Sequence, residues 1–326
     1  MHIPNHALIG AAAKIPISRP TSVLSFSPVV LPCPDRRVDL QLRVSAPSTG
    51  DALPVILLSH GHGQSNYLSS LEGYRPLADF WAGHGFVVIQ PTHLSSKSLS
   101  LSLDATNIRE LFLESRAQDM TRILDQLDAI ETAVPLLKGR LDKTKVAVAG
   151  HSMGALTASM LLGATNLDPR DGTKTQLLEK RIKAGVVIGG TGNGGSDLSN
   201  AGRSRLPFYD IDFSEMRTPA LVVWGDEDVS PHLTTRGADW HADPYNLSQG
   251  PKDSFMVKGG KHGFGGISGW DAGETSDESP ERLGAVQRMT WAYLRSQLYE
   301  GDDAWGEACR ALKGLEELGK VESQSK

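Results

Sequence analysis

Short, uninterrupted apolar runs alternate with longer, more polar segments along most of the chain. Six of these runs occupy 54–60, 85–91, 145–150, 184–190, 220–225 and 254–260. Continuous apolar runs of this length are typical of strands that are buried on both faces of a parallel sheet. Between and after them, segments with helical periodicity predict helices at 66–83, 109–134, 153–163, 230–240 and 280–299. The alternation predicts a doubly wound α/β domain with a mostly parallel sheet of about eight strands.

The two ends of the chain follow different patterns. Residues 1–20 show no convincing periodicity, and we expect them to form a loose arm. The segments 23–31 and 38–47 contain β-branched residues and alternation, which favour antiparallel strands at one edge of the sheet. We therefore place the α/β domain at 21–300 and assign 301–326 to a C-terminal helix with a polar tail. This last segment is a candidate to pack on the domain, to cover the pocket or to contact a second subunit in a homodimer.

Composition argues against several classes of partner. The 326 residues carry a formal net charge of −5 and contain no long cluster of Lys or Arg, so neither nucleic acid nor an anionic membrane surface is an expected partner. Cys33 and Cys309 lie near opposite ends of the sequence, and we expect neither a disulfide framework nor a zinc site. Because no secretion signal and no apolar run of about 18 to 20 residues is visible, we expect a cytoplasmic protein without a membrane span.

The stretch VAVAGHSMGALTASM, residues 146–160, places a serine between an expected strand and an expected helix. Gly150, Ser152 and Gly154 fit the pattern G-x-S-x-G. In this pattern a tight strand-to-helix turn holds the serine in a strained conformation and needs glycine where side chains would collide. The alternative is a serine that only caps the helix. Because the pattern follows an apolar strand and precedes a helix, we predict that Ser152 is a nucleophile.

A serine nucleophile needs a base that takes its proton and an acid that orients the base. In folds with this turn, the order along the chain is serine, acid and histidine. Downstream of Ser152, His262 is the histidine that directly follows an expected strand, so we predict that it is the base. The acid is expected after the strand at 220–225, where Asp226 and Asp228 are both candidates.

Backbone N–H groups that stabilise a tetrahedral oxyanion are expected in two places. One is Met153, directly after the nucleophile, and the second is the glycine-rich loop after the first buried strand, where we favour His62. The alternative of a metal pair at His60 and His62 lacks a third ligand with suitable spacing. We therefore expect no metal and no organic cofactor.

Further polar and aromatic residues at the strand ends are candidates for the substrate pocket. They are Gln64, Thr92, His93 and Phe264, of which Phe264 lies two residues beyond the expected base. Arg116 and Asp119, three residues apart on an expected helix, form either a surface ion pair or a brace under the site. The sequence leaves this choice open.

Four stretches together resemble a known family. They are VILLSHGHGQSNYLSSLEGYRPLADFWAGHGFVVIQPTH, AVAGHSMGALTA, PALVVWGDEDVSP and KGGKHGFGG. They resemble α/β-hydrolases of the platelet-activating-factor acetylhydrolase, chlorophyllase and dienelactone hydrolase type, and the elbow is also similar to that of bacterial polyester hydrolases and cutinases. The resemblance covers roughly 50–300. It implies the α/β-hydrolase fold, a triad of Ser152, Asp228 and His262, and an oxyanion hole at His62 and Met153; it favours Asp228 because such enzymes often carry G-x-x-D after this strand.

The resemblance implies hydrolysis of a small-molecule or lipid-like carboxylic ester through an acyl-enzyme. Amide or thioester cleavage and acyl transfer would use the same residues, and a non-catalytic ligand-binding protein on a hydrolase scaffold is an alternative of another class. Because only about 30 residues separate the strands at 184–190 and 220–225, we expect no large helical cap. The polar loop Ser95–Asp104 is a candidate for a partial lid.

Overall fold

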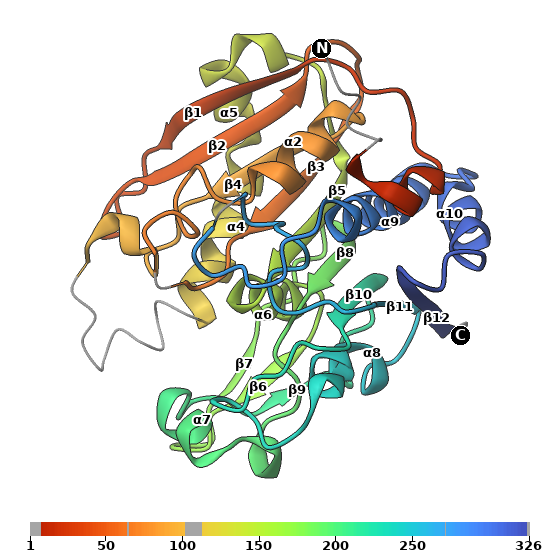
Figure 1. Cartoon of the computed structure of the whole chain (residues 1–326). Coiled ribbons are helices and arrows are strands. Elements are labelled where there is room, and N and C mark those ends of the chain that lie inside the picture. Colours follow the sequence, from red (N-terminus) through yellow and green to blue (C-terminus); the bar gives the residue numbers. More distant parts are fainter. Residues whose placement is uncertain (1–7, 64, 102–112, 271, 325–326) are drawn as a thin grey trace.

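A mixed sheet of nine strands forms the centre of the molecule (Figure 1). The computed structural model describes residues 8–63, 65–101, 113–270 and 272–324. The strand order is β1-β2-β4-β3-β5-β8-β10-β11-β12, in which the six strands from β4 to β11 run parallel and the outer strands pair antiparallel. The strands are β1 Val23–Leu31, β2 Leu40–Pro47, β3 Leu53–Ser59, β4 Val87–Pro91, β5 Leu141–His151, β8 Ile182–Ile188, β10 Ala220–Gly225, β11 Lys252–Val257 and β12 Gly319–Gln324.

Helices cover both faces of this sheet, which confirms the expected α/β fold class. One face carries α2 Arg75–Gly83, α9 Pro280–Leu298 and α10 Ala304–Leu312, together with the short 3₁₀ helix η1 Gly10–Lys14. The opposite face carries α4 Ser115–Asp125, α5 Leu127–Ala133 and α6 Met153–Leu161. Short 3₁₀ turns complete the body at η2 Lys97–Leu99 and η4 Pro135–Leu137. Among the described helices, none combines the length and apolar character needed to cross a bilayer.

Two separate apolar cores lie on the two faces of the sheet, and strand periodicity explains them. In β3, Val55 and Leu57 belong to one core, whereas Ile56 and Leu58 belong to the other. Successive side chains of a strand point to opposite faces, so a strand covered on both sides must be apolar at every position. This is why the expected central strands are continuous runs, and the structure contains a strand at each of the six.

Residues 8–20 are the described part of the loose arm expected at 1–20, and part of this segment is packed against the domain. Ala12 and Ile15 are fully buried, and the Ala11 N–H donates to Glu281 Oε1 at 2.6 Å. The absence of a side chain at Gly284 of α9 lets this segment approach closely, because a Cβ there would lie only 3.0 Å from Ile9 Cβ. Residues 9–15 are therefore packed against the domain.

The C-terminal segment contains the expected helix, α10, but the expected polar tail is a strand. Residues of β12 pair antiparallel with β11 from Lys252 to Val257, and this pairing raises the strand number to nine. Leu315 and Leu318, which lead into β12, are buried and fix the start of the strand. A polar sequence can serve at this position because it lies at the edge of the sheet.

A small lobe lies beside the main sheet, at the bottom of Figure 1, and the sequence did not predict it. Its three-stranded antiparallel sheet has the order β7-β6-β9. Its elements are β6 Thr165–Leu167, β7 Lys174–Gln176, η5 Gly195–Asp197, α7 Asn200–Arg205 and β9 Ile211–Asp212. The segment between β8 and β10, all of it described, contributes only η5, α7 and β9, so it holds no large helical cap.

Three expected helices have different limits in the structure. The first begins only at Arg75, and the second is divided into α4 and α5 at Gln126. The prediction of a helix at 230–240 is wrong. Thr234 donates its hydroxyl to the Asp197 carbonyl and forms an isolated antiparallel β-bridge with Leu198. The chain there makes turns against the small lobe and then forms η6 Ala238–Ala242 and α8 Asp243–Asn246.

Candidate active site

Ser152 occupies a strained turn between β5 and α6. Its φ of 57° and ψ of −121° lie in a region that non-glycine residues rarely adopt. The backbone N–H of Ser152 donates to the Ile188 carbonyl at 2.9 Å, which holds the turn against β8. The Ser152 side chain makes no capping hydrogen bond to α6, so the geometry disfavours the reading of this serine as a helix cap.

The two glycines of the pattern are required by close backbone contacts. A Cβ at Gly150 would collide with the carbonyl of Gly154, and a Cβ at Gly154 would collide with the carbonyl of Ser59 in β3. The first glycine therefore lets the chain reverse direction, and the second lets α6 pack directly on the sheet. Together they explain why the serine is flanked by glycine at these two positions.

Asp228 and His262 form a hydrogen-bonded pair at the carboxyl ends of β10 and β11. Nδ1 of His262 donates to Asp228 Oδ2 at 2.9 Å, and Oδ1 lies at 3.2 Å. Asp228 is 1% exposed, whereas the side chain of His262 is 42% exposed. Burial opposes the charged imidazolium, but the Asp228 carboxylate outweighs this effect and raises the pKa of His262.

The structure separates the two candidate acids. Asp226 accepts the Gly259 N–H at 2.6 Å and forms an ion pair with Lys258 at 2.8 Å. It stabilises the turn after β11 and does not contact His262. Asp228 is therefore the carboxylate next to the candidate base. Burial would raise the pKa of Asp228, but His262 holds it below its ordinary value.

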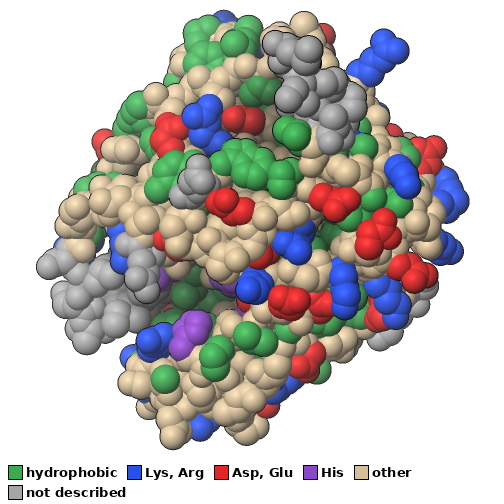
Figure 2. Space-filling view, in the orientation of Figure 1, with side chains coloured by type: hydrophobic (Ala, Val, Ile, Leu, Met, Phe, Trp, Pro, Cys, Tyr) green, Lys and Arg blue, Asp and Glu red, His purple; other side chains and the backbone are tan. Residues whose placement is uncertain are grey.

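Ser152 and His262 line one small cavity of about 50 Å³. His62 and Gly61 line the same cavity from the loop after β3, and Tyr74 lines it from the start of α2. In Figure 2 a hollow with histidine side chains in and beside it separates the small lobe from the body of the molecule. The cavity thus brings together a residue from each of three loops at the carboxyl edge of the parallel sheet, where ligands bind in open α/β sheets.

His151 links the serine turn to the loop of His262. Its Nε2 lies 2.8 Å from the His262 carbonyl oxygen, which can only accept, so Nε2 carries the proton. Its Nδ1 therefore accepts from the Tyr74 hydroxyl at 2.7 Å. That hydroxyl in turn accepts the Gly61 N–H at 3.0 Å. Burial lowers the pKa of His151 to about 3, so the ring is neutral at pH 7.

Arg116 braces the loop after β3 from below. Its fully buried guanidinium donates to Ser95 Oγ at 2.7 Å, to Ser59 Oγ at 3.1 Å and to the carbonyl of His60. Burial lowers its pKa to about 9, and the group stays charged at pH 7. Because the Arg116 guanidinium holds the His60 carbonyl, the following peptide groups at Gly61 and His62 are fixed beside the cavity.

Asp119 belongs to the same buried layer. It pairs with Arg36 at 2.9 Å, and it accepts a hydrogen bond from His93 Nδ1 at 3.0 Å. His93 Nε2 then accepts from the hydroxyl of Ser59 at 3.0 Å. Of the two interpretations of Arg116 and Asp119, a surface pair or a brace, the structure contains the brace.

The residues expected to line the pocket are placed differently. Thr92 and His93 are buried, at 2% and 0% exposure, and neither lines the cavity at Ser152. Phe264 is fully buried and packs its ring edge-on against His151, with centroids 5.8 Å apart. It supports the turn from within the core. Gln64 lies outside the described residues.

The two expected oxyanion residues lie at different places relative to the cavity. His62 lines the cavity, whereas Met153 stands at the first position of α6 and does not. The Gly61 N–H donates to the Tyr74 hydroxyl, so this donor is directed away from a bound oxyanion.

The candidate lid at Ser95–Asp104 begins at Ser95 and Ser96, which are both buried. Its last residues, 102–104, lie outside the described residues.

His60 and His62 do not form a metal pair. His60 donates from Nδ1 to the Gly61 carbonyl at 2.7 Å and accepts the His93 N–H at Nε2, 3.2 Å away. Both ring nitrogens are therefore used by the backbone. Among the described residues, one group could approach an ion: Asp228, His241 and His262, whose ligand atoms lie within 4.8 Å of one another. The hydrogen bond between Asp228 and His262 accounts for most of this proximity.

Sequence reasoning missed two residues of the site, Tyr74 and His241. His241 is 2% exposed, donates from Nδ1 to the Gly190 carbonyl at 2.6 Å and turns Nε2 toward Asp228 Oδ1 at 3.5 Å. Tyr74 lies within the first of the four stretches that carry the resemblance, directly after Gly73, but nothing in that stretch marks its hydroxyl as part of the site. His241 lies in η6, between Trp240 and Ala242, and no motif surrounds it.

We compared the sequence with curated proteins and with models of protein families. A search of curated proteins found no match. The model of the alpha/beta hydrolase family matches residues 55–318, which run from within β3 to the residue before β12 and contain Ser152, Asp228 and His262. With this match over most of its length, and with the nine-stranded sheet described above, the chain belongs to the alpha/beta hydrolase family.

Proposed function

We propose that this protein is a serine hydrolase that cleaves a carboxylic ester through an acyl-enzyme. The observation that carries the proposal is the pair of His262 and Asp228, joined at 2.9 Å, at the cavity that Ser152 also lines. A hydroxyl becomes a nucleophile when a base takes its proton and an acid orients the base. The strained backbone of Ser152 supports the proposal because such strain persists mainly at functional positions.

Each residue has a distinct role in the proposed reaction. The Ser152 hydroxyl attacks the ester carbonyl carbon, and His262 takes its proton at Nε2 because Nδ1 is held by Asp228. The negative oxygen of the tetrahedral intermediate is stabilised by the N–H groups of His62 and Met153. His262 then protonates the departing alcohol. Water attacks the acyl-enzyme with His262 again as the base, which releases the carboxylic acid and restores Ser152.

The small volume beside Ser152 supports a short acyl group. The cavity measures about 50 Å³, far below the roughly 300–1,000 Å³ of small-molecule sites in proteins. An acetyl group therefore fits this space better than a long acyl chain does, while the alcohol portion of the ester extends toward the open hollow. We expect hydrolysis rates to fall as the acyl chain is lengthened.

The test uses p-nitrophenyl acetate, butyrate and octanoate with the wild-type protein and with Ser152→Ala. We expect turnover by the wild type, fastest with acetate, and a loss of at least about 10³-fold in Ser152→Ala. A fluorophosphonate probe should label the wild type and not the variant. Equal rates in both proteins, or no turnover with any ester, would refute the proposal; ligand binding without turnover would instead support a binding protein on this scaffold. Transfer of the acyl group to an added alcohol would identify an acyltransferase.

A further inference from the structure

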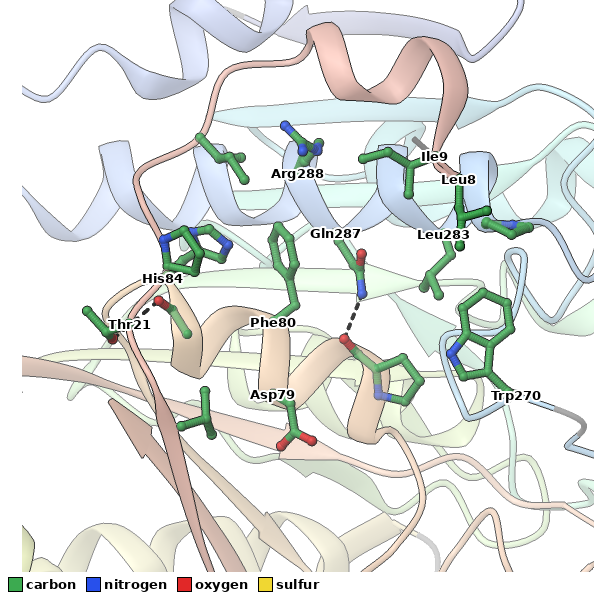
Figure 3. A pocket seen from close by; sticks show the side chains of 16 residues that line it. Leu8, Ile9, Thr21, Asp79, Phe80, His84, Trp270, Leu283, Gln287 and Arg288 are labelled. Carbon is green, nitrogen blue, oxygen red and sulfur yellow. Dashed lines mark hydrogen bonds between the residues drawn. The ribbon is translucent and has the colours of Figure 1, made fainter. Parts of the chain in front are cut away.

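A second, larger cavity lies between the N-terminal segment, α2 and α9 (Figure 3). Its volume of about 680 Å³ falls within the roughly 300–1,000 Å³ of small-molecule sites in proteins. Most of its wall is apolar, and it shares no lining residue with the cavity at Ser152. Leu8 and Trp270, which are 59% and 53% exposed, both line it. Large apolar side chains exposed beside a groove are typical of ligand sites.

Arg288 of α9 places an uncompensated positive charge in this wall. The residue is only 8% exposed. Its Nη1 donates to the Ile15 carbonyl at 2.6 Å, but its buried Nε has no hydrogen-bond partner. Among the residues that the structure describes, no carboxylate forms an ion pair with Arg288. A guanidinium that is so little exposed and has no acidic partner is costly, and an anion bound at the part of the side chain that lines the cavity would reduce this cost.

The other ionisable groups of the wall do not supply the missing anion. Asp79 lies on the side of the cavity away from Arg288 in Figure 3, and it is engaged by Arg43 and Arg75 at 3.5 and 3.6 Å. Burial lowers the pKa of His84 to about 4, so its ring is neutral at pH 7. Arg288 is therefore the single cationic side chain in the described lining. One charge of this kind matches an anion with a single negative charge.

We propose that this cavity binds a monocarboxylate with an unbranched hydrocarbon chain, such as a medium-chain fatty acid. The carboxylate accepts a hydrogen bond from Nη2 of Arg288, because Nη1 is used by the Ile15 carbonyl and Nε is buried out of reach of the cavity. The chain extends along Phe80 and Leu283, whose side chains face the same space in Figure 3. This proposal does not rest on the proposed esterase activity, because it uses none of the residues at the cavity of Ser152.

The experiment is isothermal titration calorimetry of dodecanoate, below its micelle concentration, into wild type and Arg288→Met. Methionine keeps the length of the apolar stem but removes the charge. We expect one binding site in the wild type and at least tenfold weaker binding in the variant. Arg295→Met is the matched control, because Arg295 also lies on α9, pairs with Asp302 at 2.8 Å and does not line the cavity. This control should bind dodecanoate like the wild type.

A second variant tests the location without touching the charge. Gly83 lines the cavity, and a Cβ there meets its nearest neighbour, Val23, at an ordinary 3.5 Å. The first side-chain atom of Gly83→Leu is therefore accommodated, its further atoms fill part of the space, and the variant should weaken dodecanoate binding by at least tenfold. Circular dichroism and thermal unfolding check that each variant is folded.

Two further arms complete the test. Dodecyltrimethylammonium, which carries the same chain with a positive head, should not bind, and covalent modification of Ser152 by a fluorophosphonate should leave dodecanoate binding unchanged. The proposal is overturned if the wild type does not bind dodecanoate, if Arg288→Met and Gly83→Leu both bind as the wild type does, or if modification of Ser152 abolishes binding. Ester hydrolysis is measured separately on the same samples, so a failure of either proposal is seen independently of the other.

Discussion

Replacing Tyr74 by Phe removes one hydroxyl that joins two loops of the active site. That oxygen accepts the Gly61 N–H at 3.0 Å and donates to His151 Nδ1 at 2.7 Å. Tyr74 is fully buried, so water cannot replace the lost group without rearrangement. The ring itself keeps its packing, because phenylalanine has nearly the same shape. The substitution therefore isolates the two hydrogen bonds.

The expected loss of stability follows from these two bonds. Each buried polar group left without a partner costs roughly 1–3 kcal/mol, and Tyr74→Phe leaves two, at Gly61 and His151. The free energy of unfolding should thus fall by roughly 2–6 kcal/mol, a large share of the 5–15 kcal/mol typical of a folded domain. Because the same bonds position the His262 loop and the loop after β3, kcat/KM for an ester should also fall, by about tenfold.

Urea unfolding followed by tryptophan fluorescence measures the stability change. Tyr67→Phe is the matched control, because Tyr67 is 39% exposed and its hydroxyl can be solvated; its effect should stay within about 0.5 kcal/mol. If Tyr74→Phe is as stable as Tyr67→Phe, the assigned hydrogen-bond chain does not exist in the protein. If stability falls but kcat/KM does not, the chain is structural and does not position the site.

Four further outcomes are expected. Asp228→Asn should reduce kcat about 10³-fold or more, whereas Asp226→Asn should retain nearly full activity in the same ester assay, and a larger loss in the second variant would contradict the assignment. Activity requires neutral His262, so kcat/KM should rise with pH through an inflection above 6.5, because Asp228 raises this pKa; an inflection below 6.5 would argue against His262 as the base. The pKa of His151 is lowered to about 3 in the folded state. The contribution of the neutral His151 ring to the free energy of unfolding is therefore complete above pH 6.5 and is lost as the pH falls toward 3. Urea unfolding measured across this pH range should show this loss. Gly154→Ala should destabilise the fold by about 3 kcal/mol or more, because the added Cβ would collide with backbone; a soluble variant with unchanged thermal unfolding would show that the turn is less crowded.

The central strands could be predicted because burial on both faces of the sheet requires an apolar residue at every position of a short segment. A strand such as β3 must be apolar at every position, and this pattern is visible without knowledge of its neighbours. The position of Ser152 could be predicted for a similar reason, since the crowding at Gly150 and Gly154 requires glycine at fixed offsets. The small lobe and β12 were missed, because their short or polar segments become strands only through partners that are distant in the sequence.

The pocket residues show the same limit. Thr92 and His93 follow a strand, as a site residue would, yet they lie beneath the loop after β3, where His93 bonds to Ser59 and Asp119. Their direction depends on partners that are distant in the sequence, which are Ser59 and Asp119 for His93 and Arg36 for the carbonyl of Thr92, and no local pattern indicates these contacts. Tyr74 and His241 are also beyond local reasoning, because their roles arise from contacts with residues far away in the chain.

The sequence by itself determined the six central strands of the sheet, the turn at Ser152 and the order in which an acid and a histidine follow it. These features depend on local periodicity and on glycine at fixed spacing, which each segment carries within itself. Tertiary structure alone decided that Asp228, rather than Asp226, meets His262, and that the little-exposed Arg288 lines the cavity between α2 and α9. Such choices depend on distances between separate elements and on which charges lose contact with water, and only the packed chain sets these quantities.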